Sequence, residues 1–284
     1  MAVKLSEIRV SVISRLQAVG IDDAAYEMSR LLALALGMSR ADLISDRQLT
    51  DSEVQAIDAV VTRRCSREPL DRIEGQRGFY GMEFGLSAAT LSPRADTETL
   101  VDVALECLRD HPAPRILDLG TGTGCVLLAL LMNSPTARGV GVDIAPLAIE
   151  QAQDNAAQLG LLNRAAFIRS DWYTNVDGVF DIIVSNPPYI PSAVIPQLDA
   201  EVRDYDPLAA LDGGADGLDM YRIIFAGAAA HLQTDGVVAV EIGQGQETDV
   251  QMIAAMHGFA LRAQRADLAG IIRVLAFARA RTEG

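Results

Sequence analysis

The sequence predicts an α/β protein in which a small helical bundle and a β-hairpin connector precede a doubly wound, mostly parallel sheet. Helical periodicity runs through the first part of the chain. From Arg115 onward, short apolar runs alternate with helical segments, which is the pattern of strands and helices in an open α/β sheet. The last two expected strands are joined around Gly270 by a segment too short for a helix, so we expect them to form an antiparallel edge pair.

The N-terminal part predicts a bundle of helices. Asp22-Asp23 can cap a helix that runs to Gly37, and Thr50 and Glu53 have the spacing of a capping box ahead of a later one. No alternating strand pattern occurs before about residue 75, so we interpret this part as a small helical bundle. The first helix shows an apolar stripe at three- and four-residue steps that ends at Gly20, made of Leu5, Ile8, Val12, Leu16 and Val19.

The rest of the chain predicts a connector and a sheet. Aromatic residues among glycines favour a hairpin between residues 73 and 94, and a helix is expected over Thr97–Arg109. The expected domains are therefore 1–72, a helical domain; 73–94, a hairpin connector; and 95–284, the sheet domain. Seven strands are expected, at Arg115–Leu119, Gly139–Asp143, Ala165–Arg169, Phe180–Val184, Val237–Ile242, Ala260–Arg265 and Ile272–Ala278.

Composition limits the classes of function. The formal net charge is −14 and Lys4 is the only lysine, which argues against a nucleic-acid partner because such proteins usually present a basic face to phosphate. No apolar run is long enough for a membrane-spanning helix, and the N-terminus does not resemble a signal peptide. Three scattered cysteines lack metal-ligand spacing and are typical of a reducing compartment. We expect a cytoplasmic protein with no metal and no membrane partner.

A glycine-rich loop follows the first expected strand of the sheet. Gly120, Thr121, Gly122, Thr123 and Gly124 lie between that strand and a helical run. Glycines at such a turn let the backbone approach a ligand closely; the alternative is a tight turn that needs glycine for its geometry alone. The dinucleotide fingerprint fails, because Cys125 stands where it requires glycine or alanine. The loop, preceded by Asp118, resembles the first motif of class I methyltransferases.

Two further strand ends carry candidate cofactor ligands. Asp143 ends the next strand, where a carboxylate can accept hydrogen bonds from ribose hydroxyls. The alternative for Asp143 is an ordinary helix cap. Asp171 and Trp172 end the third strand, and the methyltransferase resemblance implies that this edge faces adenine. The alternative for Trp172 is a half-buried side chain at a strand end.

Asn186-Pro187-Pro188-Tyr189 ends the fourth strand and suggests the chemistry. A carboxamide nitrogen is a poor nucleophile because its lone pair is delocalised. If the Asn186 side-chain oxygen and the Pro187 carbonyl oxygen accept its two N–H groups, the nitrogen is polarised and aligned without an added charge. Tyr189 can pack against the planar amide. We therefore expect Asn186, Pro187 and Tyr189 to act in catalysis, with Pro188 completing the substrate contact.

With both motifs present, the chain resembles the HemK/PrmC family, the N5-glutamine methyltransferases of peptide chain release factors. The resemblance covers nearly the whole chain. It extends to Glu68-Pro69, Arg72–Gly75, Gly78–Phe84, Ser92–Val101, Glu201–Pro207 and Asp212–Asp219, with Ala95 where the family usually has proline.

The resemblance implies a Rossmann-like fold and S-adenosylmethionine as cofactor. Residues 120–124, Asp143, Trp172 and Asn186 would contact the cofactor, with Asp171 beside it. The substrate would be the glutamine of the Gly-Gly-Gln motif of class 1 release factors, held by residues 186–189, and the N-terminal helices would contact the rest of the factor. Arg94, Thr97 and Glu98 would stabilise the connector or the pocket wall, with helix capping an alternative for Thr97. Residues 213–217 are either a mobile rim or a solvated loop.

Three other functions remain open at this point. A ribosomal-protein glutamine methyltransferase is the nearest. An adenine-N6 type methyltransferase of nucleic acid shares the Asn-Pro-Pro-Tyr tetrad, although the charge disfavours it. A cofactor-binding module without catalysis is the third.

Overall fold

The computed structural model describes residues 3–280, and the chain divides into two compact units. The helical unit contains the residues up to Gln76 together with Asp199–Tyr205. The sheet unit contains Arg77–Leu198 and the residues from Asp206 onward. The three-part division at residues 72 and 94 stays a prediction.

The helical unit packs its helices around their shared apolar stripes. Leu5, Val12 and Leu16 are buried, as the periodicity predicts. The capping box forms, because Thr50 Oγ1 accepts from the backbone N–H of Glu53 at 3.3 Å and Glu53 Oε2 accepts from that of Thr50 at 2.8 Å. The elements of this part are α1 (Leu5–Ala18), α2 (Ala24–Leu36), η1 (Asp42–Ile44), α3 (Asp51–Cys65) and α4 (Leu70–Glu74).

The helical unit also contains two short strands. β1 (Val3–Lys4) pairs antiparallel with β2 (Gln48–Leu49). Strands of two residues cannot show an alternating pattern, so periodicity does not detect them.

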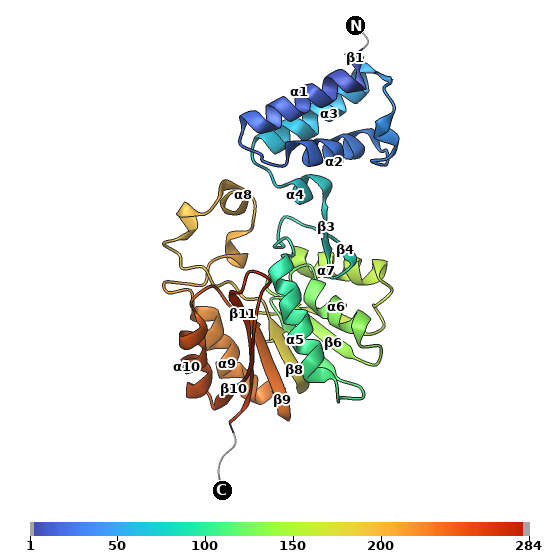
Figure 1. Ribbon diagram of the computed structural model, residues 1–284. Coiled ribbons are helices and arrows are strands. Elements are labelled where there is room, and N and C mark those ends of the chain that lie inside the picture. Colours follow the sequence, from blue (N-terminus) through green and yellow to red (C-terminus); the bar gives the residue numbers. More distant parts are fainter. Residues whose placement is uncertain (1–2, 281–284) are drawn as a thin grey trace. The chain divides into compact units, whose positions relative to one another are not determined.

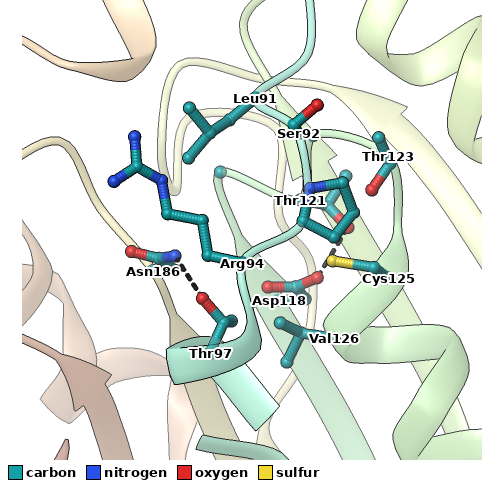
Figure 2. A pocket seen from close by; sticks show the side chains of 13 residues that line it. Leu91, Ser92, Arg94, Thr97, Asp118, Thr121, Thr123, Cys125, Val126 and Asn186 are labelled. Carbon is teal, nitrogen blue, oxygen red and sulfur yellow. Dashed lines mark hydrogen bonds between the residues drawn. The ribbon is translucent and has the colours of Figure 1, made fainter. Parts of the chain in front are cut away.

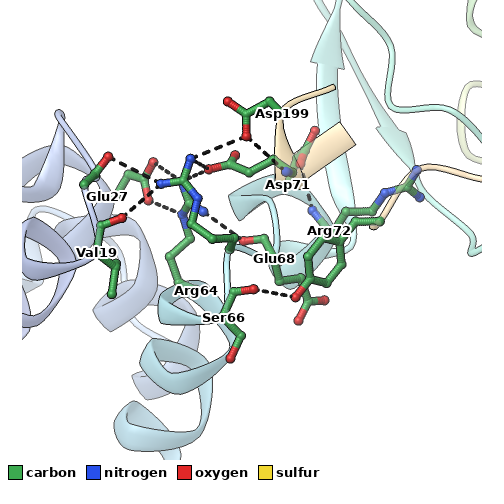
Figure 3. A network of polar contacts seen from close by, with 12 residues as sticks. Val19, Glu27, Arg64, Ser66, Glu68, Asp71, Arg72 and Asp199 are labelled. Atoms are coloured by element: carbon green, nitrogen blue, oxygen red, sulfur yellow. Dashed lines mark hydrogen bonds and ion pairs between the residues drawn. The ribbon is translucent and has the colours of Figure 1, made fainter. Parts of the chain in front are cut away.

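A segment from the middle of the chain completes the helical unit. Residues 199–205, which include α8 (Ala200–Arg203), meet Arg64 of α3. Arg64 is only 4% exposed and pairs with Glu27 at 2.5 Å and with Glu201 at 3.0 Å. The Tyr205 hydroxyl donates to the Ser66 carbonyl at 2.7 Å. Figure 3 shows Arg64 at the centre of this polar network.

The sheet unit contains seven strands in the order β10-β11-β9-β8-β5-β6-β7 (Figure 1). The strands from β5 to β9 are parallel, and β10 and β11 form the expected antiparallel pair. The bounds are β5 (Arg115–Leu119), β6 (Arg138–Asp143), β7 (Ala165–Arg169), β8 (Phe180–Ser185), β9 (Leu232–Glu241), β10 (Phe259–Ala266) and β11 (Ile272–Arg279).

β9 begins well before the expected Val237. The helix α9 (Asp219–His231) passes directly into the strand at Leu232. No turn residue separates the helix from the strand. The Asp235-Gly236 pair, whose composition is typical of a turn, lies inside β9.

Helices cover both faces of the sheet. Ile116 of β5 packs into one core together with α5 (Glu98–Leu108), α6 (Cys125–Asn133) and α7 (Pro146–Gln158). Its neighbour Leu117 packs into the other core, with α9 and α10 (Glu247–Met256). Burial on both faces explains why these strands are continuous apolar runs. In residues 3–280, none of the helices combines the length and apolar character needed to cross a membrane.

The predicted connector hairpin forms from β3 (Gln76–Phe79) and β4 (Met82–Gly85). Phe79 and Phe84 are buried in the core beneath α5 and α6. The backbone N–H of Tyr80 at the turn donates to Glu98 Oε1 at 2.7 Å. Glu98 therefore fixes the hairpin turn to the first residue of α5.

Candidate active site

Residues predicted from four separate strand ends line one cavity of the sheet unit. The carboxyl ends of parallel strands meet at one edge of a sheet, where α/β proteins bind ligands. The cavity encloses about 360 Å³, within the roughly 300–1,000 Å³ usual for small-molecule sites. Its lining includes the predicted residues Gly120, Gly122, Asp143, Asp171, Trp172, Asn186 and Pro188.

The glycine loop needs glycine for its backbone conformation. Gly120, Gly122 and Gly124 all have positive φ, between 54° and 79°. A Cβ on Gly120 or Gly122 would meet no atom within 4 Å, so crowding is not the reason for glycine at those two positions. The N–H groups of Gly120 and Thr121 both donate to the carbonyl of Val142, at 2.9 and 2.8 Å. These hydrogen bonds fix the loop to β6, and at Gly120 and Gly122 no side chain stands between its backbone and the cavity.

The threonines of the loop face a smaller adjoining cavity. Thr121 and Thr123 are buried and line it together with Asp118, Arg94 and Asn186. The Thr121 hydroxyl donates to Asp118 Oδ2 at 2.6 Å (Figure 2). Burial raises the pKa of Asp118 to about 7, an effect that the Thr121 hydrogen bond reduces. Asp118 was noted in the sequence as the acid before the loop, but it was not among the predicted ligands.

Asp143 makes cap-like contacts as well as lining the cavity. Its Oδ2 accepts from the N–H of Gly122 at 3.0 Å, and its Oδ1 accepts from that of Ala145 at 2.9 Å. Burial raises the pKa of Asp143, while these backbone hydrogen bonds lower it. Each carboxylate oxygen has a second lone pair, so both can accept from a ligand hydroxyl as well.

Trp172 is held at the cavity rim by a strained turn. It has φ +49°, which is uncommon for a residue other than glycine. Ser170 supports the turn, because its hydroxyl donates to the Trp172 carbonyl at 2.8 Å and accepts from the N–H of Asn175 at 2.9 Å. Asp171 is exposed beside it.

The Asn-Pro-Pro-Tyr segment, residues 186–189, follows directly after β8, and its first residue lines both cavities. Asn186 Nδ2 donates to Thr97 Oγ1 at 3.0 Å, and Figure 2 shows the amide nitrogen turned toward Thr97 and the oxygen away from it. Among the described residues, none donates to Asn186 Oδ1. Pro187 and Tyr189 line a neighbouring recess with Arg94. Burial raises the pKa of Tyr189 to about 12, so its hydroxyl stays neutral at ordinary pH.

The glycine-rich segment 213–217 packs against the motif at its two ends, where Gly213 and Gly217 are buried, while Ala215 and Asp216 between them are exposed. The N–H of Gly213 donates to the carbonyl of Ile190 at 2.9 Å, and Gln246 Nε2 donates to the carbonyl of Tyr189 at 3.0 Å. A Cβ on Gly217 would lie 2.4 Å from the Tyr189 carbonyl oxygen. Close approach of two backbones explains the glycines.

For one residue of the site the sequence left two roles open, and another residue was missed. Thr97 was given helix capping as an alternative, but its side chain makes no cap hydrogen bond and accepts from Asn186 instead. Glu241, 1% exposed at the end of β9, was not singled out. A charged residue inside the apolar run Val237–Ile242 was the available signal. Within residues 3–280 there is no cluster of three or more His, Cys, Asp or Glu side chains able to hold a metal ion.

Comparisons with known proteins agree with this geometry. Residues 7–75 match the family model of the PrmC N-terminal domain, and residues 95–197 match that of the methyltransferase small domain. The release factor glutamine methyltransferase of Rhodospirillum rubrum is 49% identical over 95% of this chain and 83% of that protein. The release factor glutamine methyltransferase of Agrobacterium fabrum is 47% identical over 93% of this chain and 94% of that protein.

Solved structures show the same fold at low sequence identity. The hMettl16 catalytic domain has a TM-score of 0.59 at 13% identity, covering 82% of this chain and 84% of that one. A ribosomal protein L11 methylase of Lactobacillus delbrueckii subsp. bulgaricus has a TM-score of 0.50 at 21% identity, covering 66% and 81%. The sheet unit thus has the class I methyltransferase fold. The identities over nearly the full length show that the chain belongs to the release factor glutamine methyltransferase family and is a protein-glutamine methyltransferase.

Proposed function

We propose that this enzyme transfers a methyl group from S-adenosyl-L-methionine to the N5 side-chain nitrogen of the glutamine in the Gly-Gly-Gln motif of class 1 peptide chain release factors. It would thereby act in translation termination, in the cytoplasm. The names of the full-length relatives support the substrate, and the cavity of the sheet unit supports the reaction.

The volume of the cavity and its hydrogen-bonding groups suit this cofactor. Gly120 and Gly122 leave room for close backbone approach, and Asp143 offers carboxylate oxygens for ribose hydroxyls. Trp172 gives an aromatic wall for adenine, with Asp171 as acceptor for the amino group. Thr121, Thr123 and Gly124 shape the loop. When bound, S-adenosylmethionine supplies an electrophilic methyl group on a sulfonium sulfur, and S-adenosylhomocysteine is left.

Asn186 and Pro187 would hold the glutamine. Asn186 Oδ1 and the Pro187 carbonyl accept the two amide N–H bonds, which polarises the nitrogen and turns its lone pair toward the methyl group. As the N–C bond forms, the nitrogen loses one proton to water. Pro188 and the neutral Tyr189 pack around the amide plane and exclude other solvent.

The orientation of the Asn186 carboxamide carries this proposal. One N–H of its nitrogen donates to Thr97, and the oxygen on the other side of the amide is turned away from Thr97 (Figure 2), where we propose that it meets the substrate. The substrate NH₂ group needs an acceptor here, because a donor could not accept its N–H bonds and a positively charged donor would also repel the positive charge that develops on the nitrogen. The helical unit would recognise other parts of the release factor.

The proposal is tested by methyl transfer from labelled S-adenosylmethionine to a purified release factor with its Gly-Gly-Gln glutamine intact or replaced. We expect label only on the intact factor. Absence of label on the intact factor would contradict the proposed substrate. Ribosomal protein and nucleic acid, tested in parallel, should remain unlabelled.

A further inference from the structure

A buried carboxylate lies at the edge of the site without an ion pair. Glu241 is 1% exposed, and its Oε2 makes no hydrogen bond with the described residues. No ion pair to it forms within residues 3–280, although Arg94 and Arg273 are near enough to act on it electrostatically. Burying a carboxylate in this way is costly for folding. A residue kept at such cost points to a role in the site.

The sheet places Glu241 beside Asn186. Ser185 of β8 is paired with Val240 of β9, so the next residues along the two strands, Asn186 and Glu241, emerge together at the sheet edge. Thr97, at the N-terminus of α5, makes contacts to both. Its hydroxyl accepts from Asn186 Nδ2 at 3.0 Å and lies near enough to the Glu241 carboxylate to lower the pKa of that group.

When Glu241 is ionised, the donors and acceptors of Glu241, Thr97 and Asn186 can be matched in only one way. A carboxylate can only accept, so the single Thr97 hydroxyl proton points to Glu241. The Thr97 oxygen then has only lone pairs to offer, and it must be the Asn186 NH₂ group that faces it. A carboxamide has nearly the same shape after a half-turn, so its orientation is decided by such partners.

We propose that Glu241 and Thr97 are positioning residues that set the Asn186 carboxamide with its oxygen toward the substrate amide. Neither residue touches the glutamine; they act through Asn186. This inference rests on the proposed function, because it concerns the acceptor that aligns the glutamine nitrogen. When Glu241 is protonated, it can donate to Thr97, whose own proton can then go to Asn186 Oδ1. The flipped amide presents NH₂ to the substrate and cannot align it.

The charges around Glu241 place this change near neutral pH. Burial raises its pKa to about 7, against the hydrogen bond from Thr97 and the positive charges of two arginines, Arg94 and Arg273. The negative charge of Asp96 raises the pKa of Glu241 further. The hydroxyls of Tyr189 and Tyr221 and the thiol of Cys125 also interact electrostatically with this carboxylate. These three groups are neutral near pH 7, because their own pKa values are raised.

The first test compares Thr97→Val with Thr97→Ser in methyl transfer to the release factor. Valine keeps the shape and removes the hydroxyl, so we expect kcat to fall about tenfold or more, the equivalent of one lost hydrogen bond. Serine should restore most of the rate. The affinity for S-adenosylhomocysteine, measured by calorimetry, should stay within about twofold in both. Thr248→Val, at an exposed position of α10, is the matched control and should change nothing.

The second test is the pH profile of kcat at saturating cofactor. The wild type should gain activity as pH rises through about 7. Glu241→Gln cannot titrate, so this acid limb should disappear. An unchanged limb in Glu241→Gln, or a Thr97→Val enzyme as fast as wild type, overturns the positioning role. A wild type that labels no release factor overturns the proposed function instead, so the two failures are distinct.

Discussion

At the scale of single residues, the site is built from carboxylates that the fold buries at the carboxyl edge of the sheet. Asp118, Asp143 and Glu241 end β5, β6 and β9 or lie just before their ends, and burial raises the pKa of all three. Such shifts cluster at functional sites, where they are retained against stability. We therefore expect each of these carboxylates either to lower the stability of the folded protein or to bind a ligand, and both effects can be measured.

Asp143 should be the carboxylate that cofactor binding depends on most. Asp143→Ala removes the acceptor that we propose for the ribose and the acceptor of two backbone N–H groups, so we expect the affinity for S-adenosylhomocysteine to fall roughly tenfold to a hundredfold. Isothermal calorimetry measures it. Asp177→Ala, at an exposed position outside the cavity, is the control. Equal affinities of the two variants would show that Asp143 only caps the turn.

Glu241 should lower stability at high pH. Its pKa is raised from 4.5 to about 7, so the folded state holds the proton longer than the unfolded state does. The stability that protonation provides is complete below about pH 4.5 and is lost as pH rises through about 7. Relative to wild type, Glu241→Gln should therefore gain up to about 3 kcal/mol in unfolding free energy between pH 5 and pH 8. Denaturant titrations at both pH values check this, and a pH-independent difference would contradict it.

At the scale of elements, local pattern and long-range packing contribute differently. The seven strands of the large sheet and the connector hairpin follow from local apolar runs and glycine placement, so the sequence predicts them with errors at their ends, the largest at the start of β9. The packing of residues 213–217 on Tyr189 was not predictable. It depends on backbone contacts between segments whose close approach no local pattern records.

The glycine at 217 should matter for activity beyond its backbone angle. Gly217 and Gly258 have nearly the same positive φ, +77° and +78°, but a Cβ at 258 meets nothing within 4 Å. Both alanine substitutions should cost about 1 kcal/mol of stability from backbone strain. Only Gly217→Ala should also displace Tyr189 and lower kcat, by roughly tenfold. Methyl-transfer rates of the two variants decide this, and equal rates would separate the loop from catalysis.

At the scale of the whole molecule, the chain passes between the helical and the sheet unit after Gln76, after Leu198 and after Tyr205. Sequence analysis divided the chain into consecutive pieces and did not anticipate that residues 199–205 belong with the N-terminal helices. The Tyr205–Ser66 hydrogen bond joins residues 139 apart in the sequence, and the Asn186–Thr97 bond joins residues 89 apart. Tyr205, Asn186 and Thr97 were singled out within motifs, but the partner of each is a property of the fold.

Arg64 should hold the helical unit together. Its removal leaves the carboxylates of Glu27 and Glu201 without their buried partner, so Arg64→Ala should cost about 3 kcal/mol. Arg15→Ala, which removes an exposed pair with Asp58 in the same unit, should cost less than about 1 kcal/mol. Chemical denaturation followed by circular dichroism compares them. Equal losses would mean that the Arg64 network contributes no more than a surface pair.

The alignment of a glutamine amide by Asn186 is the central claim, and the single-turnover rate of Asn186→Ala tests it most directly. The variant loses the side-chain acceptor but keeps the glycine loop and Asp143, so it should bind S-adenosylhomocysteine nearly normally. We predict that methyl transfer to the release factor falls by roughly 10²–10³. A rate near that of the wild type, with cofactor and release factor both bound, would contradict the account.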